Sequence, residues 1–310
     1  GLNAINPRGT LSSHPMAPAP STDDANSDDP FDPSDVAVSP LLIVGAPRSG
    51  TTWLQRLLLG HPACVGGQES HLLTLFDGMM TEARRKAEFE RPHGPFTLAT
   101  EKTMLDALRR VWIEILRPTL ESRPEATQLV EKTPDHALHL DLADRLLPRC
   151  RVIRLVRHPA DVAASLVRAS ARSWGRGWAP GSVEAASRRW VECVEAAESA
   201  APRFGATRFM TMRYEDLRSD PARLLGDALE FAGLSTPATE CARIVTAEGK
   251  GEGPPITLRG EFGDRSLVEP EGFGDGSGHP ALGRRDLRRC LAIAGPLASR
   301  FGHDPKGGDR

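Results

Sequence analysis

The chain has 310 residues, of which 39% are hydrophobic and 26% are charged, and its formal net charge is −2. This length allows one large domain or two small ones, and this apolar content is enough for a sizeable core. A nearly balanced charge without a strongly basic block disfavours nucleic acid as the main partner.

The cysteines and the hydropathy of the chain indicate its cellular location. The five cysteines are odd in number, and none lies in a C-x-x-C or Cys/His cluster. They therefore predict neither a metal site nor a disulfide framework, and they favour a reducing, cytoplasmic location. No apolar run is long enough for a membrane span, and no secretory signal is visible. A homodimer is left open.

The composition divides the chain unevenly. Residues 1–38 are rich in Gly, Pro, Ser, Asn and Asp and predict a disordered or linker-like segment. Met16 is a candidate natural start, which would make the residues before it foreign to the natural chain. We expect a single domain over residues 39–310, with a helical insertion at about 81–120 and a Gly/Pro-rich loop at about 249–283.

The most informative stretch is residues 41–60, LLIVGAPRSGTTWLQRLLLG. Residues 41–44 are a short apolar run typical of a buried parallel strand. Residues 45–50 form a glycine-bounded loop, and residues 51–59 predict an amphipathic helix. A strand, loop and helix in this order aim backbone N–H groups at an anion. We therefore expect a phosphate-like group to bind here.

The side chains of this loop indicate which kind of anion it binds. The loop has the spacing of the nucleotide triphosphatase pattern G-x-x-x-x-G-K-[ST], but threonine stands in place of the lysine. That lysine neutralises the outer phosphates of a triphosphate, so its absence disfavours ATP-driven chemistry. Arg48 still offers a planar fork of donors to a tetrahedral oxyanion. The other donors of the loop are Ser49, Gly50, Thr51 and Thr52.

Strands and helices alternate along the rest of the domain. Further strand candidates are residues 128–132, 151–156 and 207–212, each followed by a helical pattern. This alternation predicts an α/β fold with a P-loop-like parallel β-sheet flanked by helices. Ligands of such sheets bind beyond the carboxyl ends of the strands, which is where the polar motifs stand.

A second candidate anion site follows the strand at residues 151–156. Arg157 comes directly after that strand, and Ser165 lies two turns into the next helix. At ~1.5 Å per residue, Ser165 is about 9 Å from the start of that helix. The two side chains can meet one phosphate only if the intervening loop folds back. By themselves they are more typical of an arginine that ends a strand and a serine in a packing face.

The two motifs together resemble the sulfotransferase family. GAPRSGTTWLQRLL is followed about 100 residues later by RVIRLVRHPADVAASLV, and the resemblance covers about residues 40–235. Members of this family use 3′-phosphoadenosine 5′-phosphosulfate (PAPS). The first motif holds the 5′-phosphosulfate and the second holds the 3′-phosphate. The resemblance is strongest to the tyrosylprotein, Golgi-type and bacterial branch, and it implies the sulfotransferase fold.

The resemblance implies roles for the matching residues. The loop from Arg48 to Thr52 matches the phosphosulfate loop, and the pair Arg157 and Ser165 matches the 3′-phosphate site. Glu69 stands in the place of the catalytic carboxylate. The remaining matches are Lys132 near the transferred group, Tyr214 at the nucleotide, and Arg259, whose R-G-E-F-G-D only partly matches a late family element that also clasps the 3′-phosphate.

Sulfuryl transfer makes sense of these residue types on chemical grounds. A base must take the acceptor proton, cations must stabilise the sulfuryl and phosphate oxygens, and donor and acceptor must be held in line. Glu69 suits the first task, and Arg48 and Lys132 suit the second. His71 and His136 stay open as alternative bases. No metal is required.

The expected function is therefore the transfer of a sulfuryl group from PAPS to a hydroxyl, leaving adenosine 3′,5′-bisphosphate (PAP). An alanine- and arginine-rich composition is typical of bacteria with GC-rich genes, so we expect a small molecule, natural product or sugar as the acceptor. Trp174 and Trp178 are expected to shape its pocket. The alternatives are a P-loop kinase of a small metabolite and a non-catalytic nucleotide-binding module.

Overall fold

The structure, a computed structural model, describes residues 33–258, 265–266 and 282–303. These residues belong to one compact unit, which begins at Asp32. Arg259, the late candidate for the 3′-phosphate, lies outside the described residues, as does the larger part of the expected loop at 249–283.

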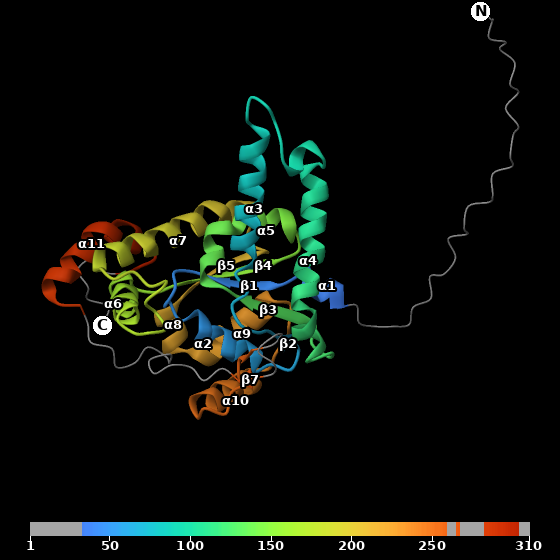
Figure 1. Cartoon of the computed structure of the whole chain (residues 1–310). Coiled ribbons are helices and arrows are strands. Elements are labelled where there is room, and N and C mark those ends of the chain that lie inside the picture. Colours follow the sequence, from blue (N-terminus) through green and yellow to red (C-terminus); the bar gives the residue numbers. More distant parts are fainter. Residues whose placement is uncertain (1–32, 259–264, 267–281, 304–310) are drawn as a thin grey trace, which may run out of the picture. The chain divides into compact units, whose positions relative to one another are not determined.

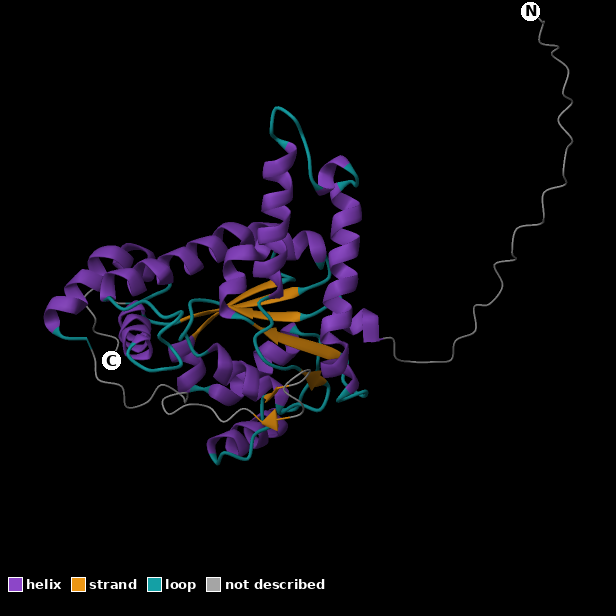
Figure 2. Ribbon diagram, in the orientation of Figure 1, coloured by secondary structure: helices purple, strands orange, loops and turns teal. Residues whose placement is uncertain are grey.

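A five-stranded parallel sheet runs through the unit in the order β2-β3-β1-β4-β5 (Figures 1 and 2). Parallel neighbours require crossover connections, and helices supply them here. The expected α/β fold with a parallel sheet is confirmed. The strands are β1 (Leu41–Val44), β2 (Cys64–Val65), β3 (Gln128–Lys132), β4 (Arg151–Val156) and β5 (Phe209–Arg213), and a separate antiparallel pair is formed by β6 (Thr257–Leu258) and β7 (Arg265–Ser266).

Helices cover both faces of the sheet (Figure 2). They are α1 (Pro33–Ala37), α2 (Thr51–Leu59), α3 (Leu72–Ala87), α4 (Glu101–Glu121), α5 (Leu140–Leu146), α6 (Pro159–Ser170), α7 (Val183–Phe204), α8 (Tyr214–Ser219), α9 (Pro221–Phe231), α10 (Ala238–Gly249) and α11 (Arg284–Ser299), with 3₁₀ helices η1 (Pro95–Thr97) and η2 (Pro134–His139). None of the described helices combines the length and apolar character needed to cross a membrane.

The central strand β1 divides the core into two parts. Successive side chains of a strand point to opposite faces. Leu42 and Val44 accordingly join the larger core, beneath α3 to α7 and α11. Leu41 and Ile43 join the smaller core, beneath α2, α9 and α10. All four residues are fully buried, which explains why this strand is apolar throughout rather than alternating.

The segment after β3 differs from a plain helix. The sequence predicts a helix over about 135–147, whereas the chain forms the 3₁₀ helix η2 before α5 begins at Leu140. The tighter winding of η2 carries His136 into the interior, where its side chain is fully buried. This departure lies directly beside the candidate site.

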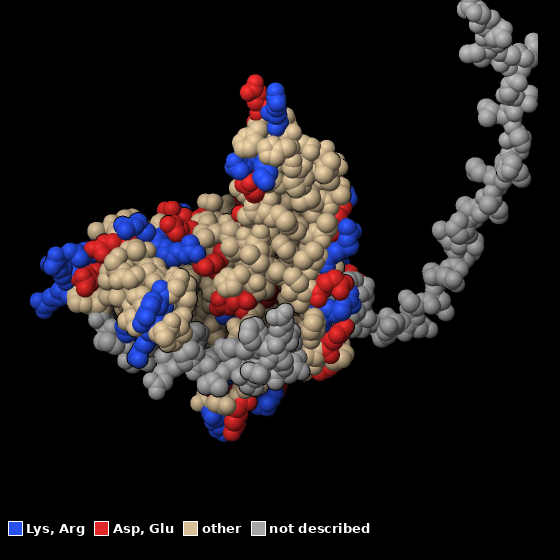
Figure 3. Space-filling view, viewed as in Figure 1, with Lys and Arg blue, Asp and Glu red and all other residues tan. Residues whose placement is uncertain are grey.

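Helices α3 and α4 form an antiparallel pair that extends beyond the sheet (Figure 1). The face of this pair in Figure 3 is largely uncharged apart from the region near its tip. Exposed apolar side chains on these two helices include Leu75, Met79, Val111 and Ile115. The pair begins at His71, next to the pocket described below.

Candidate active site

The loop between β1 and α2 lies at the carboxyl end of the central strand. Its last residue, Gly50, caps α2 in a left-handed conformation with φ 94° and no side-chain hydrogen bond. A Cβ atom at this position would lie 2.5 Å from the Tyr214 ring, so the close approach requires glycine. The first N–H groups of α2 thus lack a side-chain cap, as expected of an anion-binding helix terminus.

Arg48 connects this loop to the second motif. Its Nε donates a hydrogen bond of 3.0 Å to Ser165 Oγ on α6. Its guanidinium also lies over the Trp174 ring, 5.6 Å from the centroid. The backbone of Arg48 has φ 76°, a left-handed conformation that is strained for a residue with a side chain. The fold therefore maintains an unfavourable backbone geometry to place this arginine.

Arg157 approaches the loop from the end of β4. Its Nη1 lies 3.5 Å from the backbone oxygen of Arg48, and its guanidinium stacks 4.2 Å from the centroid of the Tyr214 ring. Trp190 Nε1 donates a 2.9 Å hydrogen bond to the backbone oxygen of Arg157, which fixes the strand end. The sequence did not predict this support from α7.

Several buried donors of the two anion motifs have no hydrogen-bond partner among the described residues. They include the hydroxyl of Ser49 and the Nε of Arg157. Buried polar groups are nearly always satisfied, so such atoms call for an explanation. Both belong to the two predicted anion motifs, and a phosphate or sulfate oxygen would satisfy either. The residues present therefore fit a bisphosphorylated nucleotide.

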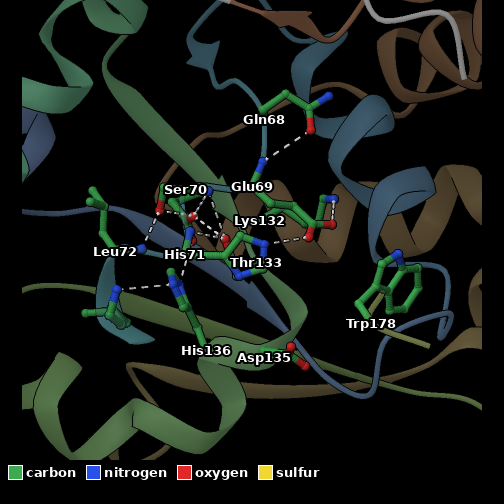
Figure 4. A network of polar contacts seen from close by, with 12 residues as sticks. Gln68, Glu69, Ser70, His71, Leu72, Lys132, Thr133, Asp135, His136 and Trp178 are labelled. Carbon is green, nitrogen blue, oxygen red and sulfur yellow. Dashed lines mark hydrogen bonds and ion pairs between the residues drawn. The ribbon is translucent and has the colours of Figure 1, made fainter. Parts of the chain in front are cut away.

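Glu69 and Lys132 form the charged centre of the site. Lys132 Nζ, at the end of β3, donates a 2.5 Å hydrogen bond to Glu69 Oε1, and His71 Nε2 lies 3.4 Å from Glu69 Oε2 (Figure 4). Burial alone would raise the pKa of Glu69, but the His71 hydrogen bond and the Lys132 charge lower it below its ordinary value. The carboxylate is therefore ionised at neutral pH and ready to accept a proton.

His71 is the second strained residue of the site. It precedes α3 with φ 51°, and its side chain is about half exposed (51%). The hydrogen bond to Glu69 raises its pKa. Among the described residues, Arg48 and His71 are the non-glycine positions with positive φ, and both line the same pocket. Strain of this kind tends to concentrate at functional sites.

A pocket of about 360 Å³ brings most of the predicted site together. Arg48, Thr51, Thr52, Glu69 and Lys132 line it directly. The other described residues predicted to bind the nucleotide are not among its lining residues; they are Ser49, Gly50, Arg157, Ser165 and Tyr214. The full lining is Pro47, Arg48, Thr51, Thr52, Gln68, Glu69, His71, Lys132, Pro134, Asp135, Trp174, Trp178 and Ile256.

Sequence reasoning gave no role to two polar lining residues, Gln68 and Asp135. They are close in sequence to Glu69 and Lys132, and that closeness is the only signal by which they could have been found. Ile256 enters from the segment after α10, within the Gly/Pro-rich loop expected at about 249–283. The Trp174–Trp178 pair lines one side, with ring centroids 6.0 Å apart, as the sequence predicted in outline.

Comparisons with known proteins point to one family. A model of the sulfotransferase family matches residues 40–238, more than half of the chain. Protein-tyrosine sulfotransferase 1 of Danio rerio is 23% identical over 279 residues, covering 86% of this chain and 73% of that protein.

Solved structures show the same fold. The sulfotransferase domain from the Synechococcus PCC 7002 olefin synthase aligns with a TM-score of 0.52 at 21% identity, covering 86% of this chain and 95% of that one. Mouse sulfotransferase SULT7A1 complexed with PAP aligns with a TM-score of 0.53 at 13% identity, covering 86% and 89%.

Proposed function

Because the chain belongs to the sulfotransferase family, we propose that it moves a sulfuryl group from PAPS to the hydroxyl of a small-molecule acceptor, with Glu69 as the general base. The observation that carries this proposal is the 2.5 Å contact between Glu69 and Lys132, in one pocket with Arg48 and the start of α2. The presence of a carboxylate and two cationic side chains in one pocket supports these roles.

The nucleotide would be held by the two anion motifs. The loop from Arg48 to Thr52 and the amino end of α2 suit the 5′-phosphosulfate, because they combine backbone donors, hydroxyls and a guanidinium. Arg157 and Ser165 suit the 3′-phosphate. PAP bound to the mouse relative of the same fold supports this choice of nucleotide. The unsatisfied Ser49 hydroxyl and Arg157 Nε support it from this chain's own residues.

The transfer step assigns one task to each group. The acceptor oxygen forms a bond to sulfur while the bond from sulfur to the 5′-phosphate oxygen breaks. The acceptor proton moves to Glu69, and the electron pair of the broken bond stays on the phosphate of PAP. Lys132 and Arg48 offset the charge on the sulfuryl and leaving oxygens. Trp174 and Trp178 form an apolar wall on which an acceptor is oriented.

The size and lining of the pocket support a small acceptor. About 360 Å³ is within the range of small-molecule sites, and it is bounded by tryptophans as well as by charges. The protein-tyrosine sulfotransferase relative makes a tyrosyl hydroxyl the comparison to test against it. The kinase alternative has less support, because the loop lacks the lysine of a triphosphate site and the family model is that of sulfotransferases.

The test combines binding with turnover. PAP binding is measured by calorimetry, and PAP release from PAPS is measured with a panel of phenols, sugars, natural-product alcohols and a tyrosine peptide, with and without magnesium. The proposal expects PAP binding and magnesium-independent turnover of a small hydroxyl compound. Binding without turnover of any acceptor would support a nucleotide-binding module instead. Exclusive turnover of the tyrosine peptide would overturn the small-molecule acceptor.

A further inference from the structure

Glu131 is a buried carboxylate that the transfer step does not use. It lies on β3 directly before Lys132 and is only 4% exposed. A buried charge is costly unless it is paired and hydrogen-bonded. Burial by itself would raise the pKa of Glu131, but the facing His136 and the hydroxyls of Thr133 and Ser70 lower it to about 2. The charge is thus retained in the interior, and its partners indicate why.

One oxygen of Glu131 holds the residue that follows the proposed base. Glu131 Oε1 accepts hydrogen bonds from Ser70 Oγ at 2.8 Å and from Thr133 Oγ1 at 2.7 Å. The backbone N–H of Ser70 in turn donates to Thr133 Oγ1 at 3.1 Å (Figure 4). Two adjacent residues of β3 therefore bind two adjacent residues of the loop before α3. Lys132 binds Glu69, and Glu131 binds Ser70.

The other oxygen of Glu131 contacts His136, which in turn binds the start of α3. His136 Nδ1 lies 3.0 Å from Glu131 Oε2, and His136 Nε2 accepts the backbone N–H of Leu73 at 3.3 Å. Because an N–H donates to Nε2, the ring proton sits on Nδ1, where it faces the carboxylate. His136 thereby satisfies one of the free donors in the first turn of α3. The residue before α3, His71, makes no side-chain cap of its own.

These contacts secure the segment from Glu69 to Leu73 at both ends. The segment contains His71, whose left-handed backbone is maintained only if the surroundings determine it. Serine, threonine and histidine contacts all converge on one buried carboxylate. Within the described part of the chain, the polar partners of Glu131 are Ser70, Thr133 and His136, and none of them lines the pocket. The effect of Glu131 on the reaction therefore passes through this segment.

We infer that Glu131 and His136 are positioning residues for sulfuryl transfer, which hold the 69–73 segment so that Glu69 is aimed beside Lys132. The inference rests on the proposed function. It also gives His136 a supporting role, in place of the alternative that this histidine is itself the base. Full burial of His136 and the use of both ring nitrogens in structural contacts argue for that assignment.

The test compares three variants with a matched control pair. Glu131→Gln replaces one acceptor of the carboxylate with a donor, and His136→Ala removes both contacts. His136→Gln retains an oxygen that can accept the Leu73 N–H. The control is the pair His139 and Asp77, whose 3.0 Å contact also joins η2 to α3 but does not touch the 69–73 segment. The control variants are His139→Gln and Asp77→Asn.

We expect Glu131→Gln and His136→Ala to lower kcat by roughly 10- to 100-fold, because misplacement of a catalytic group by about 1 Å has effects of this size. The PAP dissociation constant should stay at the wild-type value, and the acid limb of the pH–rate profile should move. His136→Gln should recover part of kcat, and both control variants should keep it. Backbone hydrogen exchange in residues 69–73 should rise in the first two variants and not in the controls.

The outcomes separate this inference from the proposed function. Absence of PAP binding and of turnover in the wild-type enzyme would refute the proposed function, and hydrogen exchange would still decide whether Glu131 and His136 hold the segment. Normal wild-type turnover with unchanged kcat and an unmoved acid limb in Glu131→Gln and His136→Ala would overturn the inference. A loss of kcat that matches only the fraction unfolded, or an equal loss in the control variants, would also overturn it.

Discussion

Arg48 and Ser165 are 117 residues apart in the chain, yet Arg48 Nε donates a 3.0 Å hydrogen bond to Ser165 Oγ. The bond joins the loop before α2 to the helix after β4. Arg157 reaches the same place, with its Nη1 3.5 Å from the backbone oxygen of Arg48. The two anion motifs are therefore in direct contact through Arg48, and a substitution in one motif should change nucleotide binding by the other.

A double-mutant cycle on PAP affinity tests this connection. Arg48→Ala should weaken PAP binding by about 10- to 100-fold, since a hydrogen bond to a charged group contributes about 1.5–3 kcal/mol. Ser165→Ala should have a smaller effect. The double variant should lose less than the sum, because residues in contact couple by about 0.5 kcal/mol or more. Calorimetry measures PAP affinity in the wild-type enzyme, the two single variants and the double variant. Arg223→Ala, which removes an exposed ion pair with Asp227, is the control. Strict additivity would show that the contact has no energetic role.

Arg157 should be irreplaceable by lysine. Its guanidinium stacks on Tyr214, 4.2 Å from the ring centroid, and offers a planar set of donors that an ammonium group lacks. We expect Arg157→Ala and Arg157→Lys to weaken PAP binding to a similar extent, by roughly tenfold or more. At saturating PAPS, kcat should change far less than affinity. Full recovery of affinity in Arg157→Lys would contradict the stacked, forked geometry.

Lys132 should set the pH at which activity is lost. The base works only when deprotonated, so activity falls as pH drops through the pKa of Glu69. In the wild-type enzyme, His71 and Lys132 hold this pKa below its ordinary value. Lys132→Met removes the ammonium while burial still favours the neutral acid, so the acid limb should move to higher pH. The profile of kcat/KM against pH measures the shift. Lys102→Met, at an exposed pair with Asp106, is the control and should leave the limb in place.

Two glycines should respond oppositely to alanine. Gly50 has φ 94°, and a Cβ there would lie 2.5 Å from the Tyr214 ring. Gly50→Ala should lower the free energy of unfolding by about 1–3 kcal/mol and abolish PAP binding. Gly78 lies within α3 with nothing within 4 Å of the added Cβ, so Gly78→Ala should raise stability by up to about 1 kcal/mol. Thermal unfolding checks both, and a neutral Gly50→Ala would mean that the loop is free to relax.

Local pattern was sufficient to predict the framework of this fold. The apolar run at Leu41–Val44, a glycine-bounded loop and an amphipathic helix correspond to β1, the anion loop and α2. Features that depend on long-range packing could not be predicted from the sequence. The 3₁₀ helix η2 was predicted as part of a longer helix, because its winding depends on the burial of His136 against α3 rather than on local propensity. The two-residue strand β2 is likewise defined only by its pairing with β3.

The site was predictable where one residue type implies one chemistry. A motif with Arg48 and hydroxyls indicates an anion. The family resemblance predicts Glu69 as base and Lys132 as cation, and the two side chains are in contact in the structure. Glu131 was not named, although it stands beside Lys132. Nothing in the sequence separates a buried carboxylate that contacts Ser70, Thr133 and His136 from a solvated one. The role of Glu131 becomes visible only in the structure, which brings β3, the 69–73 segment and the start of α3 together.

The central claim is that Glu69 takes the proton of the acceptor, and the kcat of Glu69→Gln tests it most directly. Calorimetry with PAP serves as the control for an intact nucleotide site, and His71→Gln serves as the comparison for the neighbouring histidine. Our account predicts that kcat of Glu69→Gln falls by about 10²- to 10⁴-fold with PAP affinity unchanged, and that His71→Gln keeps most of its turnover. Wild-type kcat in Glu69→Gln would contradict it and move the base to another residue.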